Sequence, residues 1–213
     1  MSEDGRSPGE SITDEAALRA LYPMPLERVR LKELDHLDGY CRRFIALSPF
    51  LVIGTTSPGR GTDVSPRGDH PGFVRVLDER RLAIPDRPGN NRLDTLSNLL
   101  CDAEVGLLFF VPGVDETVRV NGVASLSRDP ALMEASVVNG KLPRMMVLID
   151  VKQAFFHCGK ALIRARLWHD DYRVERKSLP SLGRIITEQT RIPGDTVEAA
   201  EARTERSYRE NLY

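Results

Sequence analysis

The sequence has 213 residues, enough for one domain of ordinary size, or a domain with extensions, around a buried core. Its 30 basic and 31 acidic side chains give a formal net charge of −1, which lacks the basic excess of a nucleic-acid-binding surface, so nucleic acid is not expected as a partner. The three cysteines, Cys41, Cys101 and Cys158, are far apart and in no CxxC spacing, which argues against a disulfide framework and against a metal site for zinc.

The chain also lacks the marks of export or membrane insertion. No apolar run approaches the length of a membrane-spanning helix, and residues 1–10 are polar and acidic, unlike a signal peptide. We therefore expect a cytoplasmic protein that does not bind membranes, a location that also suits unpaired cysteines.

Residues 1–48 predict a disordered lead followed by helices. The stretch 1–12 is polar and has too few apolar residues to fold. Thr13 can cap a short helix that runs to about Tyr22, where Pro23 ends it. Apolar residues at helical spacing predict a second helix over 33–47 with one face on a core, formed by Leu34, Leu37, Cys41, Phe44 and Ile45.

Residues 49–170 change to the two-residue period of β-strands. Pro66 lies inside one of the expected strands and indicates an edge strand or an irregular stretch. Because most of the strands follow one another with few crossover helices, we expect a mainly-β, antiparallel barrel with peripheral helices. The expected strands are 50–56, 63–68, 73–77, 81–84, 104–111, 116–127 and 145–156.

Residues 171–213 predict a C-terminal helical extension. A stretch punctuated by proline and glycine precedes a highly charged helix from about Thr196 to Arg209, which has few apolar positions. Such a helix does not fold well alone, so we expect it to pack on a partner subunit or to fray. The predicted organisation is therefore 1–48, 49–170 and 171–213.

Polar residues cluster where the chain enters a leucine-rich helix after the strand at 81–84. Asn91, Arg92, Asp94 and Thr95 stand at the start of that helix. One interpretation is a helix cap, with Asn91 as N-cap and Asp94 three residues on, as in a capping box. The other is an anion site, because the helix start offers unpaired N–H groups, Arg92 a guanidinium and Thr95 a hydroxyl. The residues alone leave both interpretations open.

Three further places carry candidate functional residues. In the stretch 63–69, Arg67 can place positive charge beside a bound ring, or the stretch can simply be a charged edge strand. Thr117 and Arg119 are two positions apart on one strand and therefore point to the same face. Lys160 lies in a basic helical segment, where it can bind an anionic substrate or only contact solvent.

Four runs of residues carry a resemblance to a known family: Asp63–Asp69, Ile84–Thr95, Val105–Phe109 and Glu116–Gly122. In this order they resemble the pyridoxamine 5'-phosphate oxidase-like superfamily of FMN-binding split barrels, and most of all its bacterial flavin-nucleotide-binding subgroup. The resemblance implies a split β-barrel of six to seven mostly antiparallel strands. It also implies a homodimer that binds FMN at the subunit interface.

Carried over position by position, the resemblance implies a set of cofactor-binding residues. The isoalloxazine ring would be bordered by Asp63, Val64, Ser65, Arg67, Ile84 and Pro85. The phosphate would be held by Asn91, Arg92 and Thr95. The ring or a substrate would also be approached from other strands and helices by Thr117, Arg119, Lys160 and Trp168.

The resemblance also implies a function. The vitamin B6 oxidases of the superfamily have other residues where this chain has Asp63–Gly68 and 209–213, so we do not expect oxidation of pyridoxine phosphate. We expect a flavoprotein oxidoreductase that uses FMN to move hydride between flavin N5 and a small substrate. The alternatives are a non-catalytic flavin carrier or redox sensor, and the same barrel holding a deazaflavin or haem. Haem would need an axial ligand, for which the chain offers His36, His70, His157 and His169.

Overall fold

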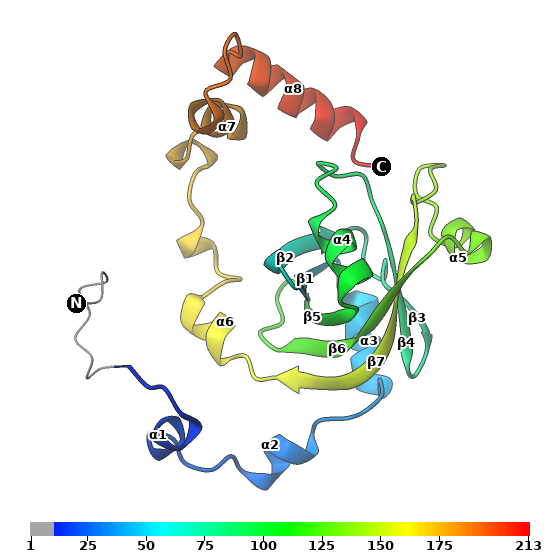
Figure 1. Ribbon diagram of the computed structural model, residues 1–213, viewed down its shortest axis with the longest axis vertical. Helices are drawn as coiled ribbons and strands as arrows, with labels where there is room; N and C mark the ends of the chain where they lie inside the picture. The colour runs from blue at the N-terminus through cyan, green and yellow to red at the C-terminus, as the bar shows by residue number, and fades with distance from the viewer. Residues whose placement is uncertain (1–10) are drawn as a thin grey trace. The chain divides into compact units, whose positions relative to one another are not determined.

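The computed structural model describes residues 11–213 (Figure 1). They fall into two units, one that ends at Glu33 and one that runs from Leu34 to Tyr213. The first unit contains α1 (Glu15–Ala20) and α2 (Glu27–Leu31). The predicted disordered lead covers residues 1–12, and residues 1–10 of it lie outside the described part of the chain.

The cap of α1 differs from the sequence prediction. Asp14, not Thr13, is the N-cap, because its carboxylate accepts a hydrogen bond of 2.8 Å from the main-chain N–H of Ala17. A capping side chain reaches the N–H two or three residues further on. Asp14 is three residues before Ala17, whereas Thr13 is four residues before it.

The second unit is built on a seven-stranded sheet with the order β2-β1-β5-β6-β7-β4-β3, in which every neighbouring pair is antiparallel. The sheet curls around a core, with helices at its periphery (Figure 1), so the predicted mainly-β split barrel is confirmed. Pro66 lies in β2, an edge strand as predicted. The strands are β1 (Phe50–Ser57), β2 (Gly61–Gly68), β3 (Arg75–Asp78), β4 (Arg81–Pro85), β5 (Glu104–Phe110), β6 (Thr117–Ser127) and β7 (Met146–His157).

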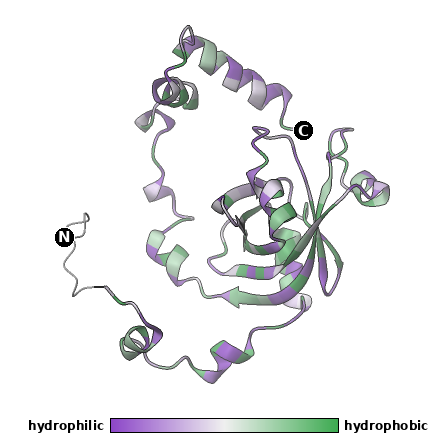
Figure 2. Ribbon diagram, in the orientation of Figure 1, coloured by the Kyte–Doolittle hydropathy of each residue, from purple (hydrophilic) through white to green (hydrophobic). Residues whose placement is uncertain are grey.

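Alternation along the strands forms the core. Leu51 and Ile53 of β1 are buried, and they pair in register with Phe109 and Leu107 of β5. Figure 2 shows hydrophobic and hydrophilic residues alternating along β6, where Val118 and Val120 are buried and Arg119 is exposed. Each such side chain contributes roughly 1.5–3 kcal/mol by leaving water.

The two longest strands, β6 and β7, change register between Asn121 and Gly122. A Cβ atom on Gly122 would lie 2.4 Å from the main-chain oxygen of Asp150, so the approach of the two strands requires a glycine there. A β-bulge of this kind bends the strands and increases their twist, which helps the sheet to curl.

Two helices pack on the sheet. α3 (Gly39–Leu47) begins at its N-cap Asp38, later than predicted, and buries Cys41, Phe44 and Ile45. Leu34 is not helical but forms a β-bridge with Ala154, because its N–H and C=O are used by that strand. α4 (Asp94–Cys101) packs on β1, β2 and β6.

The remaining helices are short or peripheral. α5 (Pro130–Glu134) follows Asp129, whose carboxylate caps it, and Pro130 stands at the helix start, where the ring of a proline is tolerated. α6 (Lys160–Ala165) is the basic helical segment that contains Lys160, and the residues up to His157 belong to β7. After the 3₁₀ turns Asp170–Tyr172 and Arg176–Ser178 come α7 (Leu182–Thr190), which was not predicted, and α8 (Val197–Glu210), which was.

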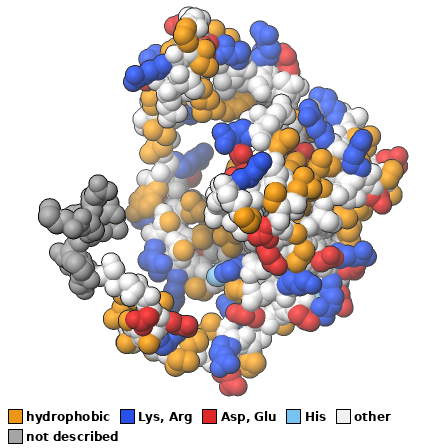
Figure 3. Space-filling view, in the orientation of Figure 1, with side chains coloured by type: hydrophobic (Ala, Val, Ile, Leu, Met, Phe, Trp, Pro, Cys, Tyr) orange, Lys and Arg blue, Asp and Glu red, His pale blue; other side chains and the backbone are white. Residues whose placement is uncertain are grey.

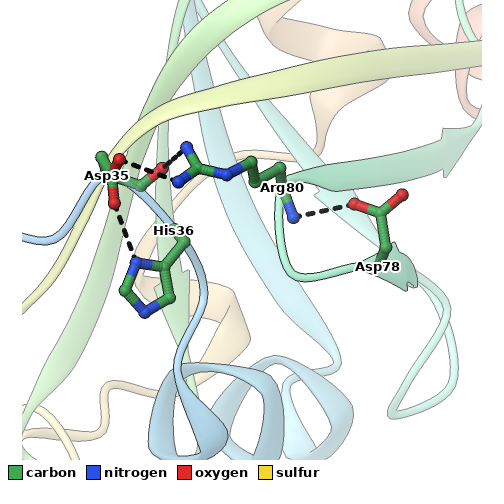
Figure 4. Close-up of polar contacts among 4 residues, drawn as sticks. All are labelled: Asp35, His36, Asp78 and Arg80. Atoms are coloured by element: carbon green, nitrogen blue, oxygen red, sulfur yellow. Dashed lines mark hydrogen bonds and ion pairs between the residues drawn. The ribbon is translucent and has the colours of Figure 1, made fainter.

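A polar cluster holds the segment before α3 to the β3–β4 turn (Figure 4). Arg80 donates to the carboxylate and to the main-chain oxygen of Asp35, at 2.9 and 3.0 Å, and its own N–H is bound by Asp78. The ring of His36 lies 2.9 Å from the Asp35 carboxylate. The hydrogen bonds of His36 and Arg80 lower the pKa of Asp35 to about 2.

The surface is mixed in character. On the face shown in Figure 3, basic and acidic side chains are interspersed with hydrophobic ones. Within residues 11–213, no helix is long and apolar enough to span a membrane.

Candidate functional site

A cavity of about 740 Å³ opens where the edge strand β2 meets the end of β4 and the start of α4. One wall is formed by alternate residues of β2, among them Asp63, Ser65 and Arg67. The opposite side is the loop 86–93, which joins β4 to α4. The remaining lining residues are Pro66, Gly68, Phe73, Pro85, Asp94, Thr95, Leu96, Arg144 and Met145.

The chain enters α4 through left-handed backbone conformations. Asn91 has φ 60° and Leu93 has φ 61°, and Leu93 is the N-cap, with no capping side chain. The prediction of Asn91 as N-cap is therefore wrong. Asn90 instead accepts a hydrogen bond of 3.0 Å from the N–H of Arg92, which turns the chain before the helix starts. The first N–H groups of α4 thus have no intrahelical partner and no side-chain cap at the cavity wall.

Four side chains form a hydrogen-bonded row along the cavity wall. Arg67 donates to the Ser65 hydroxyl over 2.8 Å, and Thr95 donates to the Asp63 carboxylate over 2.7 Å. The hydroxyl oxygens of Ser65 and Thr95 lie 2.8 Å apart. Each hydroxyl has a single proton, and that of Thr95 goes to Asp63, so Ser65 must be the donor to Thr95. The row therefore has one direction, from Arg67 through Ser65 and Thr95 to Asp63.

This direction decides what the wall offers to a ligand. Both hydroxyl protons are already used inside the row, so Ser65 and Thr95 retain only lone pairs. The wall therefore accepts hydrogen bonds from N–H groups, while Arg67 at its end keeps further N–H donors and a positive charge.

Two ionisable groups of the cavity are affected by burial. Burial lowers the pKa of Arg67, against the opposite effect of Asp86 and Asp63, although the guanidinium stays charged. Burial also raises the pKa of Asp86, against the effect of Arg67 and Arg144. The cavity thus holds a carboxyl that is protonated more readily than usual, close to two arginines.

The other two arginines of the cavity are held in ion pairs. Arg92 donates to Asp94 over 2.7 Å, and this hydrogen bond raises the pKa of Arg92. Arg87 donates to Asp69 over 2.7 Å, and the side chain of Asp69 is only 1% exposed. The Arg92–Asp94 pair is exposed to water and therefore weak, whereas the Arg87–Asp69 pair is largely buried.

The structure brings some of the predicted site residues together. Asp63, Ser65, Arg67, Pro85, Asn91, Arg92 and Thr95 all line the cavity. Val64 points to the other face of β2, as expected from strand alternation, and is 65% exposed. Ile84 is buried in the core, one position before Pro85.

Four predicted site residues are not among those that line this cavity. Thr117 is buried near the start of β6, and Arg119 is exposed on the same strand. Lys160 begins α6, and Trp168 donates from its ring N–H to the main-chain oxygen of Val114 over 2.9 Å.

Several residues of the cavity were not predicted from the sequence. Asp86 and Arg87 lie in the Pro- and Gly-rich run that follows β4, a few positions before Asn91 and Arg92. This proximity in the sequence could have identified them as cavity residues. Arg144 had no local signal. It reaches the cavity because its N–H binds the main-chain oxygen of Asp86 while the N–H of Asp86 binds Met145, next to the β4–β7 pairing.

The fold and the place of the cavity define a split-barrel protein with a polar, arginine-lined pocket between an edge strand and a helix start. The family model for pyridoxamine 5'-phosphate oxidase matches residues 37–158. The chain therefore belongs to the pyridoxamine 5'-phosphate oxidase family, as the resemblance predicted. A comparison with curated protein sequences gives no significant match.

Solved structures with a similar fold include HupZ of Group A Streptococcus, at 14% identity and a TM-score of 0.45, covering 56% of this chain and 92% of that one. Another is the FAD binding protein from Mycobacterium smegmatis, at 21% identity and a TM-score of 0.40, covering 58% and 97%. A third is an F420 reductase, at 14% identity and a TM-score of 0.40, covering 56% and 97%.

Proposed function

We propose that the cavity binds FMN and that the protein is an FMN-dependent oxidoreductase acting on a small substrate. Family membership makes a flavin the expected cofactor. The observation that carries the proposal is the row from Arg67 to Asp63, which lines a cavity of suitable size at an uncapped helix start.

The residues of the cavity fit such a cofactor in two parts. The phosphate end suits Asn91, Arg92 and the free N–H groups of the first turn of α4. Thr95 would contribute there through its main-chain N–H, since its hydroxyl proton is given to Asp63. Opening the Arg92–Asp94 pair would free the Arg92 guanidinium for phosphate oxygens.

The ring end suits the wall of β2. The lone pairs of Ser65 and Thr95 can accept from a ring N–H, and Arg67 can donate to a ring oxygen or nitrogen. Arg67 also places a positive charge where a ring that gains electrons becomes more negative. A bound flavin would supply hydride transfer, and the chain would supply binding, orientation and this electrostatic field.

We also propose a homodimer in which a second copy of the chain completes the site. Thr117, Arg119, Lys160 and Trp168 do not line the cavity of their own chain. A twofold interface places the same patches of both copies against each other, so Arg119, Lys160 and Trp168, which reach the surface, can serve the partner's cavity.

The test is to purify the protein and identify what co-purifies by its visible spectrum and mass. FMN in about one equivalent per chain supports the proposal. A deazaflavin or haem in the same stoichiometry would mean that the barrel binds that cofactor instead of FMN. A chain that neither retains FMN nor takes it up when it is added would refute the proposal. Turnover separates an enzyme from a flavin carrier. Steady oxidation of a reduced nicotinamide cofactor by the flavin-loaded protein indicates an enzyme, and a broad substrate screen without turnover indicates a carrier.

A further inference from the structure

Tyr213 contacts the barrel through its hydroxyl, its ring and its main chain. Its hydroxyl donates to Asp69 over 2.8 Å, and its main-chain oxygen accepts from the Lys141 ammonium over 2.7 Å. Its ring stacks on His70, with centroids 6.5 Å apart, and the Arg87 guanidinium lies 5.4 Å from the ring centroid. The hydroxyl, the ring and the backbone of one tyrosine are therefore each recognised separately.

Asp69 is built as an acceptor for that hydroxyl. One carboxylate oxygen receives the Tyr213 hydroxyl and the N–H of His70, and the other receives Arg87. Burial would raise the pKa of Asp69, but these hydrogen bonds outweigh it and hold the pKa below its usual value. The same hydrogen bond, with burial, raises the pKa of Tyr213, so neutral phenol and charged carboxylate stabilise each other.

The contact reaches the main cavity through Arg87. This residue belongs to the loop 86–93 that forms one cavity wall, and its guanidinium also donates to the main-chain oxygen of Ser136 over 2.9 Å. Asp69 thus joins Tyr213 on one side to Arg87 on the other. Loss of the tyrosine would leave a buried carboxylate short of one hydrogen bond and Arg87 short of its ring contact, which loosens the loop.

The segment that carries Tyr213 has its own structure. α7 and α8 pack against each other so closely that a Cβ atom on Gly183 would lie 2.6 Å from the N atom of Glu201. α8 is mostly hydrophilic (Figure 2) and has a single buried residue, Ala200. The tyrosine contact therefore supplies what this charged helix lacks, a fixed anchor on the barrel.

We infer that Asp69, His70 and Arg87, with Lys141 on the main chain, form a docking site for a tyrosine residue, that Tyr213 of this chain fills it, and that its occupancy fixes the loop 86–93. The docking stands independently of the cofactor. Only its effect on flavin binding rests on the function proposed above.

The experiment compares the full-length chain with its Tyr213→Phe and Tyr208→Phe variants by amide hydrogen exchange without added flavin. Tyr208 is the matched control, because it lies on α8 and is 58% exposed. Removal of the Tyr213 hydroxyl should speed exchange of residues 207–213 and 86–93 about tenfold, the value of one hydrogen bond to a charged group. Tyr208→Phe should change neither segment.

The outcomes separate the parts of the inference. Unchanged exchange in Tyr213→Phe overturns the docking site, and faster exchange in 207–213 alone overturns the coupling to the loop. Asp69→Asn should reproduce the effect on 207–213, since it weakens the same hydrogen bond from the other side. FMN affinity, measured next, should fall severalfold in Tyr213→Phe. A wild-type chain that binds no FMN would refute the proposed cofactor while leaving the exchange result valid.

Discussion

The side chains of the cavity wall differ in how firmly they are held, and this decides what each can do. Arg67 is tied to Ser65 and to the main-chain oxygen of Pro66, both at 2.8 Å, so its position is fixed before a ligand arrives. Arg92 is 72% exposed and pairs with Asp94, two positions further along the chain. The fixed guanidinium of Arg67 suits the ring. That of Arg92, which can leave an exposed ion pair, suits the phosphate, whose oxygens can be approached from several directions.

Arg92→Ala should therefore weaken FMN binding and leave the fold intact. The variant removes a charge-assisted contact to phosphate without touching the core, and it leaves Asp94 unpaired at the helix start. We expect Kd to rise about tenfold or more, as measured by quenching of flavin fluorescence.

Arg42→Ala provides the control for that loss of charge, because Arg42 is an exposed arginine of α3 outside the cavity. It should bind FMN like the unchanged protein. Equal affinity of the Arg92→Ala variant and the control would remove Arg92 from the proposed phosphate site.

The three cysteines should differ sharply in reactivity. Burial, with a smaller effect of Asp38, raises the pKa of Cys41 to about 12, and Cys41 is 1% exposed. Cys101 and Cys158 are exposed. Because the thiolate is the reactive form, a thiol reagent at pH 8 should label Cys101 and Cys158 in the native protein and Cys41 only after unfolding. Peptide mapping checks this, and rapid native labelling of Cys41 would show that α3 opens.

At the scale of elements, the sequence predicted what depends on local pattern. The strand alternation and the edge position of the Pro66 strand follow from neighbouring residues and were found as predicted. The start of α4 was not, because left-handed conformations at Asn91 and Leu93 move the N-cap to Leu93, a residue with no capping side chain. Arg144 and the Tyr213 contact could not be predicted either, since each joins positions far apart in the chain.

The bulge between β6 and β7 gives a test of packing in the sheet. Gly122→Ala places a methyl group against the Asp150 main-chain oxygen, and the backbone must move to admit it. The free energy of unfolding should fall by about 1–3 kcal/mol, measured by urea denaturation. Gly54→Ala in β1 is the matched control, because its nearest atom, the Gly106 oxygen, lies 3.8 Å away. If the two variants lose the same stability, the close approach at Gly122 is not the cause.

The polar cluster of Figure 4 predicts how stability depends on pH. The pKa of Asp35 is about 2 in the folded chain, below its ordinary value of 3.8, with the His36 and Arg80 hydrogen bonds as the main causes. A lowered carboxylate pKa adds stability above the unfolded pKa, and that stability is lost as the pH falls through the folded pKa. Asp35→Asn should therefore be less stable than the unchanged chain near pH 6.

That difference should disappear as the pH is lowered from 3.8 to about 2. Urea midpoints recorded across this range measure it, with Glu205→Gln on α8 as a control for loss of one exposed negative charge. A deficit of Asp35→Asn that stays constant down to pH 2 would mean that the carboxylate charge does not stabilise the turn.

For the whole molecule, the proposed dimer explains why one chain shows only part of the predicted site. The β2 wall, the loop and the start of α4 surround the cavity, whereas Thr117 and Trp168 lie elsewhere in the chain. If the partner supplies the second set, each site combines the cavity of one protomer with Arg119, Lys160 and Trp168 of the other. The mass in solution should then be twice the 23.8 kDa of the chain, by light scattering.

Mixed dimers test this division of the site more sharply than mass does. Arg67→Met damages the cavity set and Trp168→Ala the other set, so either variant alone should have weak FMN sites. When both are unfolded together and refolded as a mixture, half of the dimers contain one chain of each kind, and one of their two sites is intact. About a quarter of all sites should then bind FMN with full affinity, by random pairing in a twofold dimer. If each site lies within one chain, no mixture restores any, because every chain still carries its own defect.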